Sequence, residues 1–182
     1  MNLTTLKWSL SDWHKLIESG ILDDKNVELL EGEIINMAPE GISHSATNRE
    51  IDDYLRELLK NKAYISQAHP ITLIDSEPQP DVAILRLPKQ NYRTRHPKAQ
   101  DIYWLIEVSE TTLNFDLEKK ANIYASNSIA EYWVIDLKNK QVIVHTQPIN
   151  NRYQKIEKFK TGAIIPIAFP DLKVDLKQIL IY

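Results

Sequence analysis

An acidic residue interrupts the apolar run Ile102-Tyr103-Trp104-Leu105-Ile106-Glu107-Val108, which has the length and composition of a buried β-strand. A second acidic residue lies in the preceding apolar run, Gln79-Pro80-Asp81-Val82-Ala83-Ile84-Leu85. A carboxylate loses much of its hydration when a strand carries it toward a core, so it usually needs a metal ion or another cation nearby. Asp81 and Glu107 on neighbouring strands therefore indicate a metal site.

A helix is expected after the second of these strands, from about Asn114 to Ser126. Its apolar stripe at helical spacing consists of Leu117, Ala121, Tyr124 and Ala125. Asp116, Lys120 and Tyr124 are spaced to share one flank of the helix, whereas Lys119 is turned away by about 100°. We therefore predict that Lys120 is the basic residue that turns toward the strand carboxylates.

Several segments of the chain occur in an order that is known from one protein family. They are Val27-Glu28-Leu29-Leu30-Glu31-Gly32-Glu33 followed by His44, then Asp81, Glu107-Val108-Ser109, Asp116-Leu117-Glu118-Lys119-Lys120, Tyr124 and Glu131-Tyr132-Trp133-Val134-Ile135-Asp136. The ordered set resembles the Uma-two family of restriction-endonuclease-like proteins, within the PD-(D/E)XK nuclease superfamily. This resemblance implies a metal-dependent endonuclease that hydrolyses phosphodiester bonds of nucleic acid, above all of DNA.

The resemblance also implies roles for individual residues. Asp81 and Glu107, with the carbonyl of Val108, would hold Mg²⁺ or Mn²⁺, and Lys120 would orient the attacking water or offset the growing charge. Glu28 and His44 would hold a second ion or position the water. Ser109 stands where the superfamily motif has its lysine. The resemblance implies that the lysine comes from the following helix instead, at the position of Lys120.

The composition fits one small enzyme domain spanning residues 1–182. The chain has no cysteine, so a metal ion must be held by oxygen or histidine, which favours Mg²⁺ or Mn²⁺. No apolar stretch approaches the length of about 18 residues that a membrane span needs, and the amino terminus does not have the pattern of a secretion signal. We expect a cytoplasmic protein.

The net charge of −3 is unusual for a protein that binds DNA by its phosphates. The distribution of charge is more informative, because Val82 to Gln100 contains basic residues and no acidic one. From this stretch we predict four residues that contact nucleic acid: Arg86, Arg93, Arg95 and Lys98. The alternative is a loop whose charges only keep it solvated.

The predicted elements alternate between helices and strands. Helices are expected over Ser9–Gly20, from Ser43 to about Lys60, and over Asn114–Ser126. Strands are expected over 33–37, 63–67, 82–87, 102–108, 131–136, 141–146 and 152–158, with a hairpin turn at 137–140. This order predicts an α/β (α+β) fold with a mixed central sheet flanked by helices, which is the restriction-endonuclease-like fold that the resemblance also implies.

Two other functions fit parts of the pattern. A catalytically inactive module with the nuclease fold would bind nucleic acid or protein, in agreement with Ser109 and the negative charge. A glycosidase would use Asp81 and Glu107 as acid and base, but this function gives Lys120 no task. The expected partners are nucleic acid and a second copy of the chain in a homodimer, and no membrane is expected.

Overall fold

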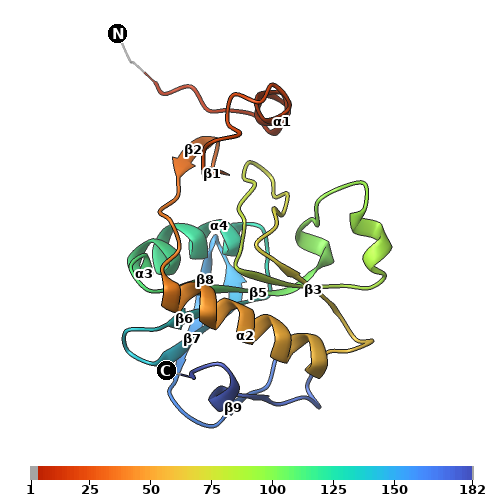
Figure 1. Cartoon of the computed structure of the whole chain (residues 1–182), viewed down its shortest axis with the longest axis vertical. Helices are drawn as coiled ribbons and strands as arrows, with labels where there is room; N and C mark the ends of the chain where they lie inside the picture. Colours follow the sequence, from red (N-terminus) through yellow and green to blue (C-terminus); the bar gives the residue numbers. More distant parts are fainter. Residues whose placement is uncertain (1–3, 182) are drawn as a thin grey trace.

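The computed structural model describes residues 4–181, which are built around a six-stranded mixed sheet (Figure 1). The strand order follows the sequence order: β3 (Tyr64–Gln67), β4 (Val82–Leu85), β5 (Ile102–Ser109), β6 (Glu131–Asp136), β7 (Gln141–Ile149) and β8 (Arg152–Phe159). All neighbouring strands are antiparallel except β5 and β6, which are parallel. The parallel pair requires a crossover, and the helical segment after β5 provides it.

Helices cover both faces of this sheet, so its central strands are buried on both sides and their sequences are continuously apolar. On one face lies α2 (Ile42–Leu58), whose Ile51 and Leu55 are part of a core with Trp104 and Trp133. On the other face lie α3 (Leu113–Phe115), a π-helical turn η3 (Asp116–Lys120) and α4 (Ala121–Ser126). The core on that face includes Leu105, Tyr124, Tyr132 and Val134.

Two groups of smaller elements, one near each end of the described chain, lie outside the six-stranded sheet. Helix α1 (Leu10–Glu18) and the hairpin of β1 (Val27–Leu30) and β2 (Glu33–Asn36) form a small core of their own around Trp13. The backbone N–H of Glu77 donates to the carbonyl of Leu29 at 2.7 Å, which attaches the hairpin to the segment before β4. At the other end, β9 (Ala163–Ile164), β10 (Val174–Asp175) and the 3₁₀ turn η4 (Leu176–Gln178) pack on the α2 face.

The predicted mixed sheet flanked by helices is confirmed, with three local corrections. Helix α2 begins at Ile42 with Gly41 as its N-cap, so Ser43 is already helical and does not cap it. Strand β4 ends at Leu85 because the next N–H, of Arg86, donates to the carbonyl of Asp101 outside the ladder. The segment 113–126 is helical as predicted but is not a continuous α-helix, since the π-helical turn interrupts it.

Two 3₁₀ turns, η1 (Lys89–Tyr92) and η2 (Ala99–Asp101), lie between β4 and β5. Among residues 4–181, no helix is both long enough and apolar enough to cross a membrane.

Candidate active site

The two strand carboxylates meet at one end of β4 and β5. Asp81 directly precedes β4, and its Oδ2 accepts a hydrogen bond of 2.6 Å from the backbone N–H of Val108. Glu107 lies in the adjacent strand, and both residues are buried, with 8% and 3% of their surface exposed. The structure therefore brings Asp81, Glu107 and Val108 together at one place, as the sequence pattern predicts.

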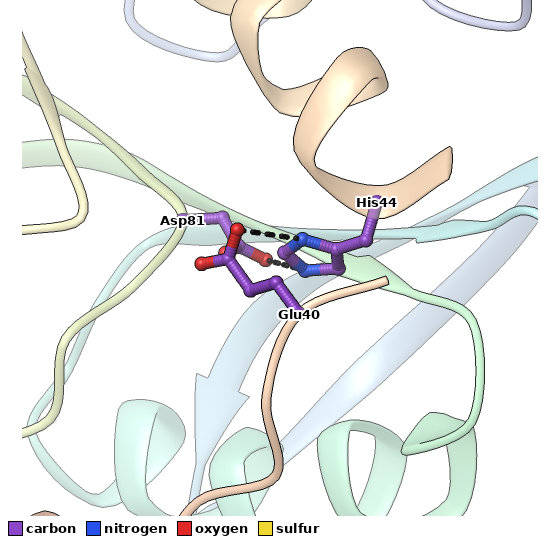
Figure 2. Close-up of side chains that lie close together, drawn as sticks. All are labelled: Glu40, His44 and Asp81. Atoms are coloured by element: carbon purple, nitrogen blue, oxygen red, sulfur yellow. Dashed lines mark hydrogen bonds and ion pairs between the residues drawn. The ribbon is translucent and has the colours of Figure 1, made fainter. Parts of the chain in front are cut away.

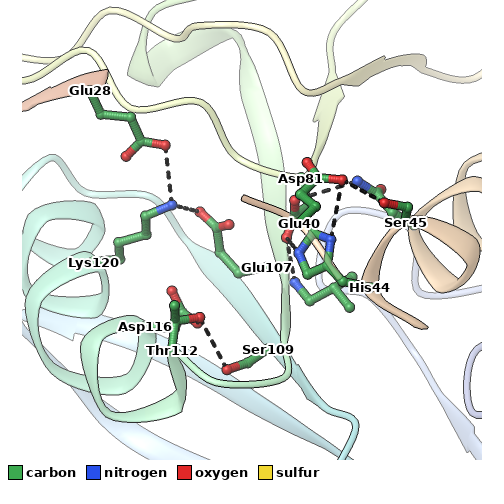
Figure 3. Close-up of polar contacts among 12 residues, drawn as sticks. Glu28, Glu40, His44, Ser45, Asp81, Glu107, Ser109, Thr112, Asp116 and Lys120 are labelled. Carbon is green, nitrogen blue, oxygen red and sulfur yellow. Dashed lines mark hydrogen bonds and ion pairs between the residues drawn. The ribbon is translucent and has the colours of Figure 1, made fainter. Parts of the chain in front are cut away.

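Lys120 is delivered to the same place by the helical segment after β5. Its Nζ lies 3.0 Å from Glu107 Oε1 and 3.4 Å from Glu28 Oε1, and only 3% of the residue is exposed (Figure 3). Lys119 points away and forms an ion pair with Glu31, which is half-exposed. Lys120 is the last residue of the π-helical turn η3. Turns of this kind are rare overall, and those that occur are often found at functional sites.

Glu28 and Tyr124 complete the surroundings of Lys120 and Glu107. Glu28 is the second residue of β1, and its Oε1 accepts a hydrogen bond of 3.2 Å from the backbone N–H of Gln79. The hydroxyl of Tyr124 donates to Glu107 Oε1 at 2.7 Å. Carboxylates from two strands distant in sequence, β1 and β5, thus meet at the ammonium group that η3 carries, and α4 holds one of them through Tyr124.

Beyond Asp81 the cluster continues to the first turns of α2 (Figure 2). His44 Nε2 lies 3.1 Å from Asp81 Oδ2, and its Nδ1 lies 3.5 Å from Glu40 Oε2. Asn48, one turn further along α2, donates its amide to Asp81 Oδ1 at 3.4 Å. Ligand atoms of Glu40, His44 and Asp81 all lie within 4.8 Å of one another, which is close enough for one ion to contact all three.

Ser109 takes part in a different set of contacts. Its Oγ lies 3.5 Å from Thr112 Oγ1, and Thr112 donates to Asp116 Oδ2 at 2.7 Å (Figure 3). Ser109 is buried and brings no charge to Glu107. The positive charge beside Glu107 is that of the Lys120 ammonium group.

Burial dominates the electrostatics of the cluster. Burial raises the pKa of Glu107 to about 8, although the Lys120 ammonium acts in the opposite direction. Burial also raises the pKa of Glu28 and of Asp116. Burial opposes the charge on Lys120, but Glu107 and Glu28 outweigh it and raise the pKa of the ammonium above its ordinary value.

His44 responds to the same environment. Burial by itself lowers the pKa of its imidazole, but the hydrogen bond and charge of Asp81 and the charge of Glu40 outweigh it and raise that pKa to about 9. The cluster contains more carboxylates than cations, an arrangement that a divalent cation would stabilise.

The donor atoms of the cluster fit such an ion. Carboxylate oxygens and one imidazole are ligands that Mg²⁺ and Mn²⁺ accept in proteins. Within the described part of the chain, Glu28 Oε2 is buried without a hydrogen-bond partner, although it belongs to the lining of the cavity that also contains Asp81, Glu107 and Lys120. A buried orphan carboxylate oxygen usually marks a site that takes an ion or water.

The four residues that are predicted to contact nucleic acid differ in what surrounds them. The Arg86 guanidinium lies 4.3 Å from the ring centroid of Tyr103 and donates to the carbonyl of Gln100. Arg95 forms two hydrogen bonds, of 2.6 and 3.2 Å, with the carboxylate of Asp101. Arg93 and Lys98 are exposed and line a cleft next to the site. Arg86 and Arg95 are thus engaged within the protein, although Arg95 also lines the cleft, whereas Arg93 and Lys98 line the cleft without forming an ion pair in the described part of the chain.

The fold and this acidic cluster define a protein of the restriction-endonuclease-like class. The chain belongs to the Uma2 family, whose model, described as "Putative restriction endonuclease", matches residues 11–177. Among curated proteins there is no match.

Two of the solved structures that are similar to the chain differ in the strength of that similarity. One is described as a "putative nuclease belonging to DUF820" from Anabaena variabilis ATCC 29413. It is 19% identical with a TM-score of 0.66, and the match covers 86% of this chain and 90% of that one, which shows a shared fold. The other, the type IIG restriction endonuclease BpuSI, is 15% identical with a TM-score of 0.43, and the match covers 70% of this chain and 15% of that one. The second likeness is too weak to support an argument.

Three residues of the cluster have no counterpart in the sequence prediction: Glu40, Asn48 and Thr112. His44, Asn48 and Asp52 recur at intervals of four in α2 and so lie on one side of the helix. From this spacing the sequence could have predicted that Asn48 lies near the site with His44. Glu40 precedes the helix, and its approach to His44 depends on the path of the loop. No sequence pattern fixes that path.

Proposed function

We propose that this chain is a metal-dependent endonuclease that hydrolyses phosphodiester bonds of nucleic acid, with DNA as the first substrate to test. The observation that supports the proposal best is the position of the Lys120 ammonium, buried at 3.0 Å from Glu107 beside Asp81. A buried lysine held against carboxylates at the end of two strands is costly to maintain and has a direct use in phosphoryl chemistry.

The metal would be held by Asp81 and Glu107, with the Val108 carbonyl, and Glu40 and His44 offer further ligand atoms. When bound, an Mg²⁺ or Mn²⁺ ion polarises the phosphate and lowers the pKa of a coordinated water. The proposed role of Lys120 is to neutralise charge on a phosphate oxygen as the attacking oxygen adds. Glu28 and Tyr124 keep this ammonium and the Glu107 carboxylate in place through their contacts.

The cleavage test uses two neighbouring lysines that point in different directions. Supercoiled plasmid and single-stranded DNA are incubated with Mg²⁺ or Mn²⁺ and wild-type protein, the Lys120→Ala variant or the Lys119→Ala variant. Wild type and Lys119→Ala should cleave, and Lys120→Ala should lose cleavage while retaining metal binding. Equal activity in the two variants would overturn the role of Lys120.

One observation favours a second candidate, a nuclease-fold module that binds without cleaving. Ser109 replaces the strand lysine of the superfamily motif and is bound to Thr112 within the protein. If the wild type cleaves no nucleic acid, the variant Ser109→Lys becomes informative. Cleavage by that variant would show that only the ammonium was missing. The homodimer and the cytoplasmic location stay predictions.

A further inference from the structure

A large cleft adjoins the candidate active site. It has a volume of about 1040 Å³ and shares two lining residues, Asn26 and Gln79, with the smaller cavity that contains Asp81 and Glu107. Gln79 also contacts the site directly, because its backbone N–H donates to Glu28. The two cavities are therefore neighbours that meet at Asn26 and Gln79, so a molecule that reacts at the carboxylates can extend toward the cleft.

Two segments far apart in sequence line this cleft. One wall consists of residues of α1 and of the chain that follows it, including His14 and Lys25, and the other consists of residues from the segment 92–98 between β4 and β5. Lys25, Arg93 and Lys98 are exposed, and none of them forms an ion pair within residues 4–181. Lys25 shares its wall with the exposed carboxylate of Glu18, whereas no acidic residue of the segment 92–98 lines the cleft beside Arg93 and Lys98.

The α1 wall is held in place by a buried carboxylate, Glu77. Its oxygens accept hydrogen bonds from Trp13 Nε1 at 2.8 Å and from Thr72 Oγ1 at 2.6 Å, and one of them lies 3.0 Å from His14 Nε2. These contacts satisfy the oxygens of Glu77 and fix the position of α1 beside the cleft. The basic residues that line the cleft, Lys25, Arg93, Arg95 and Lys98, outnumber the acidic ones, Glu18 and Glu77, although the chain as a whole is acidic.

We propose that this cleft binds a single strand of nucleic acid that runs on from the scissile phosphate, with Lys25 on one wall and Arg93 and Lys98 on the other contacting its phosphates. This inference rests on the proposed nuclease function. The volume of about 1040 Å³ is slightly above the range of about 300–1,000 Å³ for clefts that enclose compact organic ligands, so the cleft has room for a few nucleotides. Unpaired cations on both walls match a polyanion that passes between them.

Binding is tested without divalent ions, so that no cleavage occurs and the result does not depend on the chemistry at Glu107. Anisotropy of a fluorescein-labelled oligothymidine is measured against salt concentration for the full chain. Each lost phosphate contact should reduce the slope of log K against log[salt] by about 0.7 for a single strand. Lys25→Gln should therefore lower the slope by about 0.7, and Arg93→Gln with Lys98→Gln by about 1.4.

A control variant with the same loss of charge as the double variant combines Lys138→Gln and Lys173→Gln, two exposed lysines that do not line the cleft. It should keep the wild-type slope. The proposal would be overturned if the slope of log K against log[salt] fell in the variant Arg93→Gln with Lys98→Gln but not in Lys25→Gln. The nucleic-acid strand would then contact only one wall and would not pass between the two. A loss seen only with a blunt duplex probe would overturn it as well. Failure to cleave in the separate assay would contradict the nuclease function while leaving this binding result readable.

Discussion

Replacing Lys120 by methionine removes one charge from the cluster and keeps most of the volume of the side chain. The ammonium lies between Glu107 and Glu28, at 3.0 and 3.4 Å, and all three residues are buried. Breaking a buried pair by removing one partner costs about 3–5 kcal/mol, because the other charge is left uncompensated. Glu107 can avoid this cost by taking up a proton. Taking up that proton costs about 1.4 kcal/mol for each unit by which the pH exceeds the ordinary pKa of 4.5, so this amount is the upper limit of the cost.

The cost of Lys120→Met therefore depends on pH. At about pH 9 the Lys120 ammonium compensates an ionised Glu107 in the wild type, where the pKa of Glu107 is about 8. Without that ammonium the pKa of Glu107 rises further, so the variant must bury an uncompensated carboxylate or protonate it against the pH, and a cost of up to about 3–5 kcal/mol is expected. At about pH 6 Glu107 is already protonated, and the cost should fall below about 2 kcal/mol. The matched control is Lys119→Met, whose partner Glu31 is half-exposed, and it should cost less than about 1 kcal/mol at either pH.

Urea denaturation followed by tryptophan fluorescence measures these differences, because a change in midpoint at constant slope reports a change in the free energy of unfolding. Similar costs for the two lysine variants would refute the assignment of Lys120 as the buried cation. So would a cost for Lys120→Met that is the same at both pH values.

Three further outcomes are expected. Because burial raises the pKa of Glu107 to about 8 from 4.5, the folded metal-free protein favours the protonated carboxyl. This stabilisation is complete below about pH 4.5 and is lost as the pH rises through about 8, so Glu107→Gln should flatten the dependence of stability on pH in that interval. Mn²⁺ should raise the melting temperature of the wild type, by an amount equivalent to about 2.7 kcal/mol at a hundredfold excess over Kd, and Asp81→Asn should remove the rise while the exposed control Asp53→Asn keeps it. Arg95→Gln should lower stability by about 1 kcal/mol, measured by urea denaturation, because it breaks the two hydrogen bonds to Asp101. Nucleic-acid binding by Arg95→Gln should depend on salt as in the wild type. A lower slope of log K against log[salt] would show that Arg95 leaves Asp101 to contact phosphate.

The sequence predicts the strand carboxylates and the lysine well because their physical signals are local. An acidic residue inside an apolar strand, such as Glu107, is costly wherever the strand lies, so its presence indicates a compensating group. The choice of Lys120 over Lys119 needs only the direction of successive residues on a helix. Both residues point as predicted, even though the segment contains a π-helical turn and not a regular α-helix.

The remainder of the site depends on how separate segments pack together. Glu40 carries no periodic signal, and it joins the cluster because the loop before α2 returns toward Asp81. The basic stretch 86–98 is recognisable as a group of charges, but its sequence does not reveal that Arg95 is bound to Asp101 whereas Arg93, in the same cleft, forms no ion pair with a described residue. Pairing of this kind is decided by side chains that meet only in the folded chain.

The central claim, a divalent metal ion held by the strand carboxylates, is tested most directly by locating Mn²⁺ through its anomalous scattering in crystals of the wild-type protein. The account predicts a peak within coordination distance of Asp81 and Glu107, about 2.0–2.2 Å for each ligand oxygen, that disappears in Glu107→Gln. A peak elsewhere on the protein, or no peak at a Mn²⁺ concentration that supports cleavage, would contradict it.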